Sequence, residues 1–260
     1  MSQPGAINPR FAGTARLLGA EGFARVAASH VCVIGLGGVG SWVVEALARS
    51  GVGALTLVDQ DEVCISNVNR QLHALTTTVG QSKAEALAQR VALIHPDCRV
   101  QIIPRFFKKT TAEEILAPGY DVVVDAIDGV AHKARLIGMC WQRGLPVIAS
   151  GGAGGKCDAA RVCVADLADT VYDPLLAFIR KRLRKWFDFP RGDRKFGIPC
   201  VYSPEPPAEN PESCRPAKTP GVRANCDTGL GALAPVTGTF GLLMAGYVIN
   251  RIAGVCSGQA

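Results

Sequence analysis

The chain has 260 residues, 48% of them hydrophobic and 19% charged, which is enough to bury a sizeable core and excludes a disordered protein or a disulfide-dependent miniprotein. Its N-terminus lacks the basic start and apolar run of a secretion signal, so we expect a cytoplasmic protein whose ten cysteines are reduced and mostly pack in the core. The net charge is only +6, but segment 178–195 alone holds eight basic and two acidic residues, which favours a polyanionic partner there.

Apolar strands alternate with helices along the first half of the chain. We predict strands over 31–35, 54–59, 99–104, 120–126 and 145–150, and helices over 39–49, 83–94 and 130–143. This alternation predicts an α/β fold with a doubly wound, mainly parallel Rossmann-like sheet and a ligand at the carboxyl ends of its strands. Residues 1–155 form the Rossmann-like part, and residues 156–260, after the sequence GGAGG, form a second part of the same domain.

The second part contains a crossover and a terminal apolar helix. The proline-rich stretch 202–221 is predicted to be a long loop or a partly disordered crossover. Residues 229–249 are uncharged and long enough to span a bilayer, but Pro235 and five glycines lower their helical quality. Because a buried helix can also be apolar all round, we expect a buried helix and no stable membrane partner, with membrane association as the alternative.

A glycine-rich motif, GLGGVG, connects the first predicted strand to the first predicted helix. Gly35, Gly37 and Gly40 have the G-x-G-x-x-G spacing, which permits a tight turn and offers helix N–H groups to phosphate oxygens. Asp59 closes the second strand, where a carboxylate accepts hydrogen bonds from ribose hydroxyls. These features suit a nicotinamide cofactor as well as they suit ATP.

Polar residues after the second strand favour a triphosphate over a dinucleotide. Arg70 follows this strand and Lys83 opens the next helix, and two cations compensate the charge of a leaving pyrophosphate. Asp125 and Asp128 end the fourth strand, where a carboxylate binds Mg²⁺ against phosphates. The alternatives are a solvated surface pair for the two cations and a helix N-cap for Asp128. Just past the second strand lie Asp61, Asn67, Arg70 and Gln71.

These motifs, with VGQSKAE, DAID, PCVYSPEPP and CDTGLGALAPVTGTFG in this order, resemble the ubiquitin-activating-enzyme-like adenylyltransferases over about residues 10–253. The resemblance implies adenylation of a carboxylate by ATP and a homodimer with sites near its interface. It assigns Gly37 and Gly38 to the phosphates, Asp59 to the ribose and Asp128 to magnesium. The predicted ATP site comprises Gly35, Gly37, Gly38, Gly40, Asp59, Asp61, Asn67, Arg70, Lys83 and Asp128.

The chain also departs from that family. Many relatives bind a structural zinc through two Cys-x-x-Cys pairs, but here Ser203 stands where the partner of Cys200 would be and no such pair occurs, so we predict no structural zinc. Relatives often place an arginine near their N-terminus that reaches the triphosphate of the other subunit. Gly13 occupies that position here, and Arg16 follows three residues later.

Within the family, RFAGTARLLG, GGAGG, the basic segment and the zinc-less crossover are most similar to members that act on tRNA. These use ATP to close the threonylcarbamoyl group of a modified adenosine into a ring, a dehydration through an acyl adenylate. We therefore expect a basic helix that contacts tRNA, anchored to the body by Phe178, Leu183 and Trp186, with a solvated helix face as the alternative. The expected tRNA contacts are Arg180, Lys181, Arg184 and Lys185.

Three other functions stay open: adenylation of a ubiquitin-like sulfur carrier, an NAD-binding oxidoreductase, and a non-catalytic nucleotide sensor. Cys214 is a candidate nucleophile, because Arg215 or Lys218 would lower the pKa of its thiol, and Cys226 heads the last helix; the alternative is that neither has a chemical role. A cysteine desulfurase or a sulfur acceptor is a candidate partner. The predicted catalytic residues are Arg70, Lys83, Asp128 and Cys214.

Overall fold

The computed structural model describes residues 7–208 and 230–255. Its strands are β1 (His30–Ile34), β2 (Ala54–Val58), β3 (Arg99–Ile103), β4 (Val122–Asp125), β5 (Val147–Ser150), β6 (Cys163–Asp166) and β7 (Pro199–Tyr202). Its α-helices are α1 (Ala12–Ala28), α2 (Gly40–Arg49), α3 (Lys83–Ile94), α4 (Ala112–Ile115), α5 (Val130–Gln142), α6 (Pro174–Trp186) and α7 (Ala234–Ala253). Short 3₁₀-helices are η1 (Pro9–Phe11), η2 (Ile65–Asn67), η3 (Ala159–Arg161) and η4 (Leu167–Asp169).

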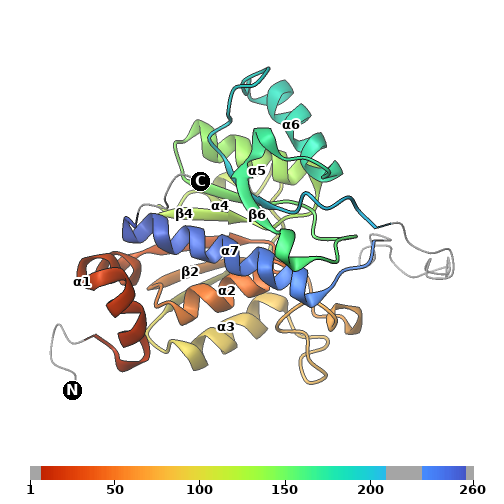
Figure 1. Ribbon diagram of the computed structural model, residues 1–260. Helices are drawn as coiled ribbons and strands as arrows, with labels where there is room; N and C mark the ends of the chain where they lie inside the picture. Colours follow the sequence, from red (N-terminus) through yellow and green to blue (C-terminus); the bar gives the residue numbers. More distant parts are fainter. Residues whose placement is uncertain (1–6, 209–229, 256–260) are drawn as a thin grey trace.

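The strands form one sheet in the order β3-β2-β1-β4-β5-β7-β6 (Figure 1), so strands from both sides of residue 155 share it. All neighbouring pairs are parallel except β6 and β7, which confirms the predicted doubly wound, mainly parallel α/β fold. The chain leaves β1 toward β2 on one side and reaches β4 on the other. This reversal of strand order opens a crevice at the carboxyl ends of β1 and β4, where ligands bind in such sheets.

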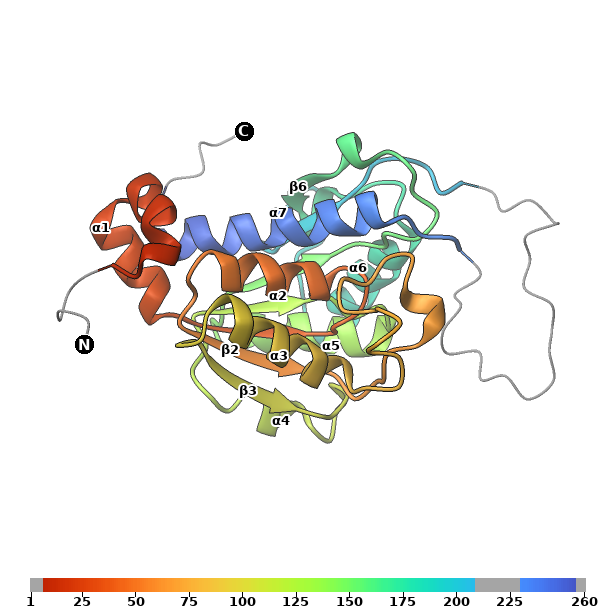
Figure 2. The same cartoon turned by 90° about the horizontal axis from the view of Figure 1, so that it is seen from below.

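Helices cover both faces of the sheet (Figures 1 and 2). Val31 and Val33 of β1 point into a core shared with α2, α3 and α7. Cys32 and Ile34 point the other way, into a core shared with α5 and α6. Because side chains alternate along a strand, a strand buried on both faces is apolar at nearly every position, as β1 is after His30 and β2 is except at Thr56.

The apolar helix α7 packs along α2 (Figure 2). A side-chain carbon on Gly241 would lie 2.6 Å from Cβ of Trp42, so this glycine, which lowers helix propensity, allows the two helices to approach closely. Among residues 7–208 and 230–255, no helix has the length and apolarity needed to cross a membrane.

The expected basic helix is present as α6, but it covers only the first half of the basic segment 178–195. Helix α6 begins at Pro174, where the side chain of Asp173 accepts a hydrogen bond from the Leu176 amide, and it ends at Trp186. Asp188 has a left-handed φ of 53°, and Pro190 disfavours helical backbone at the residue before it. The remaining basic residues of the segment therefore lie on an irregular loop.

Candidate nucleotide-binding site

The glycine-rich turn lies at the carboxyl end of β1, beside the loop that follows β4. Gly35 has φ 89°, and a side-chain carbon there would lie 2.6 Å from the Ala126 carbonyl oxygen; one on Gly40 would lie 1.8 Å from the Gly35 oxygen. The turn itself therefore requires both glycines. Gly37 is different, because its nearest neighbour would be Nε2 of Gln71 at 3.7 Å, which leaves room for a ligand to approach the backbone.

Asp59, directly after β2, is 7% exposed and holds the turn in place. Its Oδ2 accepts a hydrogen bond from the Leu36 amide at 2.7 Å, and its Oδ1 accepts one from the Asp61 amide at 2.9 Å. Burial raises the pKa of this carboxyl, and the two amide bonds oppose the rise. Both oxygens retain lone pairs that can accept hydrogen bonds from ribose hydroxyls, as the sequence predicted for this position.

Arg70 lies against the turn: a side-chain carbon on Gly38 would lie 3.4 Å from its Cγ. Its Nη1 donates to the Ser66 carbonyl at 2.9 Å and to Oδ1 of Asn69 at 2.8 Å, but no carboxylate neutralises it in the part of the chain that the structure describes. Trp42 and Thr237 donate to its carbonyl oxygen, which fixes its backbone. A guanidinium held this way can bind a phosphate.

Two amide residues flank this arginine. Asn67 is 3% exposed, and its Oδ1 accepts a hydrogen bond from the Cys64 amide at 3.0 Å, so its carbonyl end builds the loop. Gln71 is 7% exposed, lies against Gly37, and has an Oε1 atom without a hydrogen-bond partner. A buried polar atom without a partner is costly unless a ligand satisfies it. Gln71 therefore joins the candidate site; only its place in the loop signalled this in the sequence.

Lys83 and Asp61 form an ion pair with 3.1 Å between Nζ and Oδ2. The lysine side chain is 9% exposed and the aspartate side chain 53% exposed. The solvated surface pair considered for Arg70 and Lys83 is therefore wrong, because Lys83 is buried and its partner is Asp61. Asp61 therefore holds the ammonium group of Lys83 in place, and the Asp61 carboxylate itself is open to solvent.

The two aspartates after β4 have different environments. Asp125 is fully buried and pairs with the fully buried Lys133 of α5 at 2.9 Å, so it is not available to a metal ion. Asp128 is exposed and makes no hydrogen bond or ion pair with the described residues. The N-cap of α5 is Gly129, so Asp128 is not the cap. Lys133 was missed from the sequence, although it lies on the buried stripe with Ala134 and Ile137.

Of the predicted catalytic residues, Cys214 lies outside the described residues, as do Arg215, Lys218 and Cys226. Cys200 is buried in β7, and burial raises the pKa of its thiol. Ser203 is also buried, and its Oγ accepts a hydrogen bond from the Glu205 amide at 3.2 Å. Within the described ranges, no three His, Cys, Asp or Glu side chains are grouped as a metal site.

The predicted basic contacts point in two directions from α6. Lys181 and Lys185 are exposed. Arg180 is half-buried and donates to Oγ1 of Thr170, and Arg184 is half-buried and donates to the Pro190 carbonyl. Burial lowers the pKa of Arg180.

The predicted anchors of α6 were partly wrong. Leu183 is buried, but Phe178 is 56% exposed and Trp186 is 41% exposed. The buried stripe of α6 consists of Leu176, Ile179 and Leu183.

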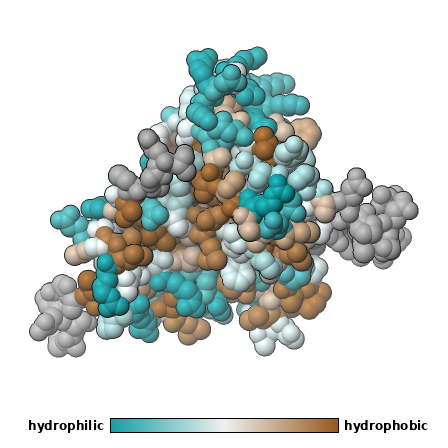
Figure 3. Space-filling model, in the orientation of Figure 1, coloured by the Kyte–Doolittle hydropathy of each residue, from teal (hydrophilic) through white to brown (hydrophobic). Residues whose placement is uncertain are grey.

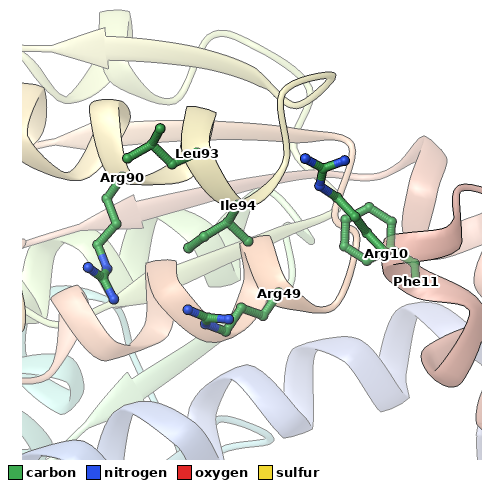
Figure 4. A pocket seen from close by; sticks show the side chains of 6 residues that line it. All are labelled: Arg10, Phe11, Arg49, Arg90, Leu93 and Ile94. Atoms are coloured by element: carbon green, nitrogen blue, oxygen red, sulfur yellow. The ribbon is translucent and has the colours of Figure 1, made fainter.

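A separate cavity of about 450 Å³ lies among η1, α2 and α3 (Figure 4). Arg10, Arg49 and Arg90 line it, and Glu45 accepts hydrogen bonds from Arg49 and Arg90. Burial acts to raise the pKa of Glu45, but the hydrogen bonds from these arginines lower it overall. Arg49 ends α2 and the glycine turn begins it, so the cavity is at the opposite end of this helix from the candidate site.

Comparisons with known proteins show the family to which the chain belongs. A model of the ThiF family matches residues 11–259. The chain is 46% identical over 246 residues to the tRNA threonylcarbamoyladenosine dehydratase of Haemophilus influenzae, covering 94% of this chain and 93% of that protein. It is 42% identical over 249 residues to the protein of the same name from Escherichia coli, with the same two coverages.

The fold is also similar to solved structures. The E. coli tRNA N6-threonylcarbamoyladenosine dehydratase in complex with ATP superposes with a TM-score of 0.85 at 40% identity and covers 96% of both chains. The same protein in complex with AMP has a TM-score of 0.84 at 41% identity and covers 94% of both chains.

Proposed function

The chain belongs to the ThiF family, and we propose that it catalyses the ATP-dependent dehydration of N6-threonylcarbamoyladenosine in tRNA. The observation that most supports this function is the 46% identity to a dehydratase of that name along 94% of the chain, which includes α6 as well as the glycine-rich turn. Oxidoreductase activity is not favoured, because Arg70, which no carboxylate of the described residues neutralises, and the buried Lys83 suit a triphosphate.

The proposed reaction has two steps. An oxygen of the threonyl carboxylate attacks the α-phosphorus of ATP, and pyrophosphate leaves with the electron pair of the broken bond. A nucleophile within the same threonylcarbamoyl side chain then attacks the acyl carbon, loses its proton, and displaces AMP, which takes the carboxylate oxygen with it. The net change in the nucleoside is the loss of one water. An intramolecular nucleophile has a high effective concentration, so the protein mainly positions groups and neutralises charge.

The turn residues and two cations perform the first step. Backbone N–H groups at Gly37 and the start of α2 hold phosphate oxygens, and the open space at Gly37 permits this approach. Arg70 and Lys83 stabilise the negative charge that grows on the leaving pyrophosphate. Asp128 fits a magnesium site, because its exposed carboxylate has no partner among the described residues; bound Mg²⁺ would neutralise phosphate charge there.

A homodimer is the second part of the proposal. On helix α7, Thr237 lies beside Gly38 of the glycine turn, and Ala253 lies beside Gly22 of α1. At a rise of 1.5 Å per residue, these two positions of the helix are about 24 Å apart. Because α1 packs at the far end of α7, we infer that Arg16 on α1 acts at the site of another copy rather than at the site of its own chain. Exposed apolar side chains suited to a subunit contact occur in the loop before Arg70, directly before α7 and in the middle of α7: Ile65, Val68, Leu233 and Leu242. Figure 3 shows apolar surface along this face of the molecule.

Contact between α6 and tRNA completes the proposal. The exposed Lys181 and Lys185 are suited to phosphates, whereas Arg180 and Arg184 reach solvent only in part. The reaction itself needs no sulfur carrier, because the carboxylate and the attacking group belong to one side chain.

The test is incubation of the purified protein with ATP, Mg²⁺ and tRNA that contains threonylcarbamoyladenosine, followed by mass analysis of the nucleosides. We expect a nucleoside lighter by one water, formed only when ATP is present. An unchanged nucleoside, with the E. coli dehydratase active under the same conditions, would contradict the proposed function.

A further inference from the structure

The outer face of α6 combines exposed aromatic rings with cations. Phe178 and Trp186 are 56% and 41% exposed, although apolar rings of this size are usually buried. Nζ of Lys181 lies 5.8 Å from the centroid of the Phe178 ring, and Cζ of Arg182 lies 5.1 Å from that of Trp186. With Lys185, these positions follow the three- and four-residue spacing of one helix face.

Helix α5 adds a further cation to this face. Cζ of Arg135 lies 5.7 Å from the Trp186 centroid, so one indole ring contacts guanidinium groups from two helices. Cation–π contact fixes the position of a guanidinium and leaves its N–H donors free. Trp186 therefore holds Arg135 and Arg182 close together, ready to bind an anion.

None of these four cations is neutralised within residues 7–208 and 230–255: Arg135, Lys181, Arg182 and Lys185 form no ion pair or hydrogen bond there. Other cations of the molecule are paired, such as Arg143 with Glu113 and Lys195 with Asp169. Hydrophilic side chains dominate this part of the surface, at the top of Figure 3. An unneutralised cluster of this kind attracts polyanions.

We propose that this α5–α6 surface, defined as Arg135, Phe178, Lys181, Arg182, Lys185 and Trp186, binds an unpaired loop of the tRNA substrate. Phosphates contact the cations, and a nucleobase stacks on the exposed Phe178 ring. An acidic protein would match the charge, but exposed rings between cations are typical of surfaces that bind single-stranded nucleic acid. This inference rests on the proposed function and deepens it: it keeps Lys181 and Lys185 of the predicted contact and replaces Arg180 and Arg184 with Arg135, Arg182 and two exposed rings.

The experiment measures binding of two probes, a full-length unmodified tRNA and a blunt RNA duplex without a loop. The variants are Phe178→Ala, Trp186→Leu and the pair Lys181→Glu with Lys185→Glu. The matched control is Lys108→Glu with Lys109→Glu, which makes the same charge change at the opposite edge of the sheet, after β3. Lys108 also lies over an exposed ring, Phe106, at 5.4 Å, so Phe106→Ala is the control for Phe178→Ala.

We expect Phe178→Ala to weaken tRNA binding by roughly 5-fold to 150-fold, the effect of losing one stacked base, and to leave duplex binding almost unchanged. Trp186→Leu should weaken tRNA binding although it removes no charge, because it releases two guanidinium groups. The double lysine reversal should reduce the salt slope of tRNA binding by about 1.4, since each single-strand phosphate contact contributes about 0.7. Both control variants should bind tRNA like the unmutated protein.

The inference would be overturned if Phe178→Ala and Trp186→Leu bound tRNA as tightly as the unmutated protein and Phe106→Ala, provided that ATP binding and the urea unfolding midpoint show folded protein. Equal losses for duplex and tRNA in Phe178→Ala would also overturn it, because stacking on an unpaired base would then be excluded. The proposed function can fail independently of this inference. If the unmutated protein binds tRNA through this surface but does not modify it, the proposed reaction is contradicted and the proposed tRNA contact still holds.

Discussion

Nζ of Lys133 lies 2.9 Å from Oδ2 of Asp125, and both side chains are fully buried beneath the loop that leads to Asp128. The same ammonium donates hydrogen bonds to the carbonyl oxygens of Asp125 at 3.2 Å and Ile127 at 3.1 Å. Burial raises the pKa of Asp125, and the lysine opposes the rise. Lys133 therefore fixes the backbone that carries the candidate magnesium ligand.

Loss of Lys133 should destabilise the protein strongly. Lys133→Met leaves a buried carboxylate without its counter-charge, which costs about 3–5 kcal/mol of unfolding free energy. The double variant Lys133→Met with Asp125→Leu should recover part of this loss, because no uncompensated charge remains. Urea unfolding measures both. A loss below about 1 kcal/mol in the single variant would show that the pair contributes little.

Arg70 and Lys83 should affect turnover more than they affect ATP binding. We expect Arg70→Ala and Lys83→Ala each to reduce turnover by roughly 10² or more, because each removes a preorganised charge from the leaving pyrophosphate, while ATP affinity falls less. Arg105→Ala, which breaks an exposed pair with Glu114 that involves none of the candidate site residues, is the control. Near-normal product formation by Arg70→Ala or Lys83→Ala would remove that residue from the site.

Asp128→Asn tests the magnesium assignment. The side chain is exposed and makes no hydrogen bond or ion pair with described residues, so the variant should unfold like the unmutated protein. Turnover measured against magnesium concentration should require more Mg²⁺, because an amide binds this ion less well than a carboxylate. An unchanged magnesium dependence would place the ion elsewhere.

Much of the nucleotide site could be predicted because its signals are local. The turn depends on glycines whose spacing is visible in the sequence, and α3 has the predicted bounds because Ser82 caps it. The orientation of α6 depends instead on which side packs against α5. The spacing of Leu176, Ile179 and Leu183 signalled the buried stripe, but the charge run drew the prediction toward Arg180.

Other site features follow from tertiary contacts that the sequence does not show. The free Oε1 of Gln71 is recognisable only once the loop is folded against Gly37. The Lys133–Asp125 pair joins a strand end to a helix face. The spacing of Lys133 with Ala134 and Ile137 places it on the buried stripe of α5, but the sequence does not show that Asp125 is its partner.

His73 should make stability depend on pH. It is buried, neither ring nitrogen has a hydrogen-bond partner in the described structure, and burial with Lys83 nearby lowers its pKa to about 4. As the pH falls below 6.5, the pKa of this histidine in the unfolded chain, the unfolded state takes up a proton that the folded state does not bind. Stability is therefore full above pH 6.5 and is lost as the pH falls toward 4. The free energy of unfolding should therefore fall by about 2 kcal/mol between about pH 7.5 and about pH 5.

His73→Phe keeps a ring of similar size and removes the titrating group. Its unfolding free energy should therefore change less between these two pH values than that of the unmutated protein. An identical change in both proteins would show that His73 does not titrate as its burial implies.

Pyrophosphate release tests the central claim most directly. The purified protein is given ATP and Mg²⁺ with tRNA that contains threonylcarbamoyladenosine, with the same tRNA lacking this modification, with a ubiquitin-like sulfur carrier, or with no substrate. We predict that only the first mixture releases pyrophosphate, in step with formation of the dehydrated nucleoside. Release with the sulfur carrier and none with the modified tRNA would contradict the account.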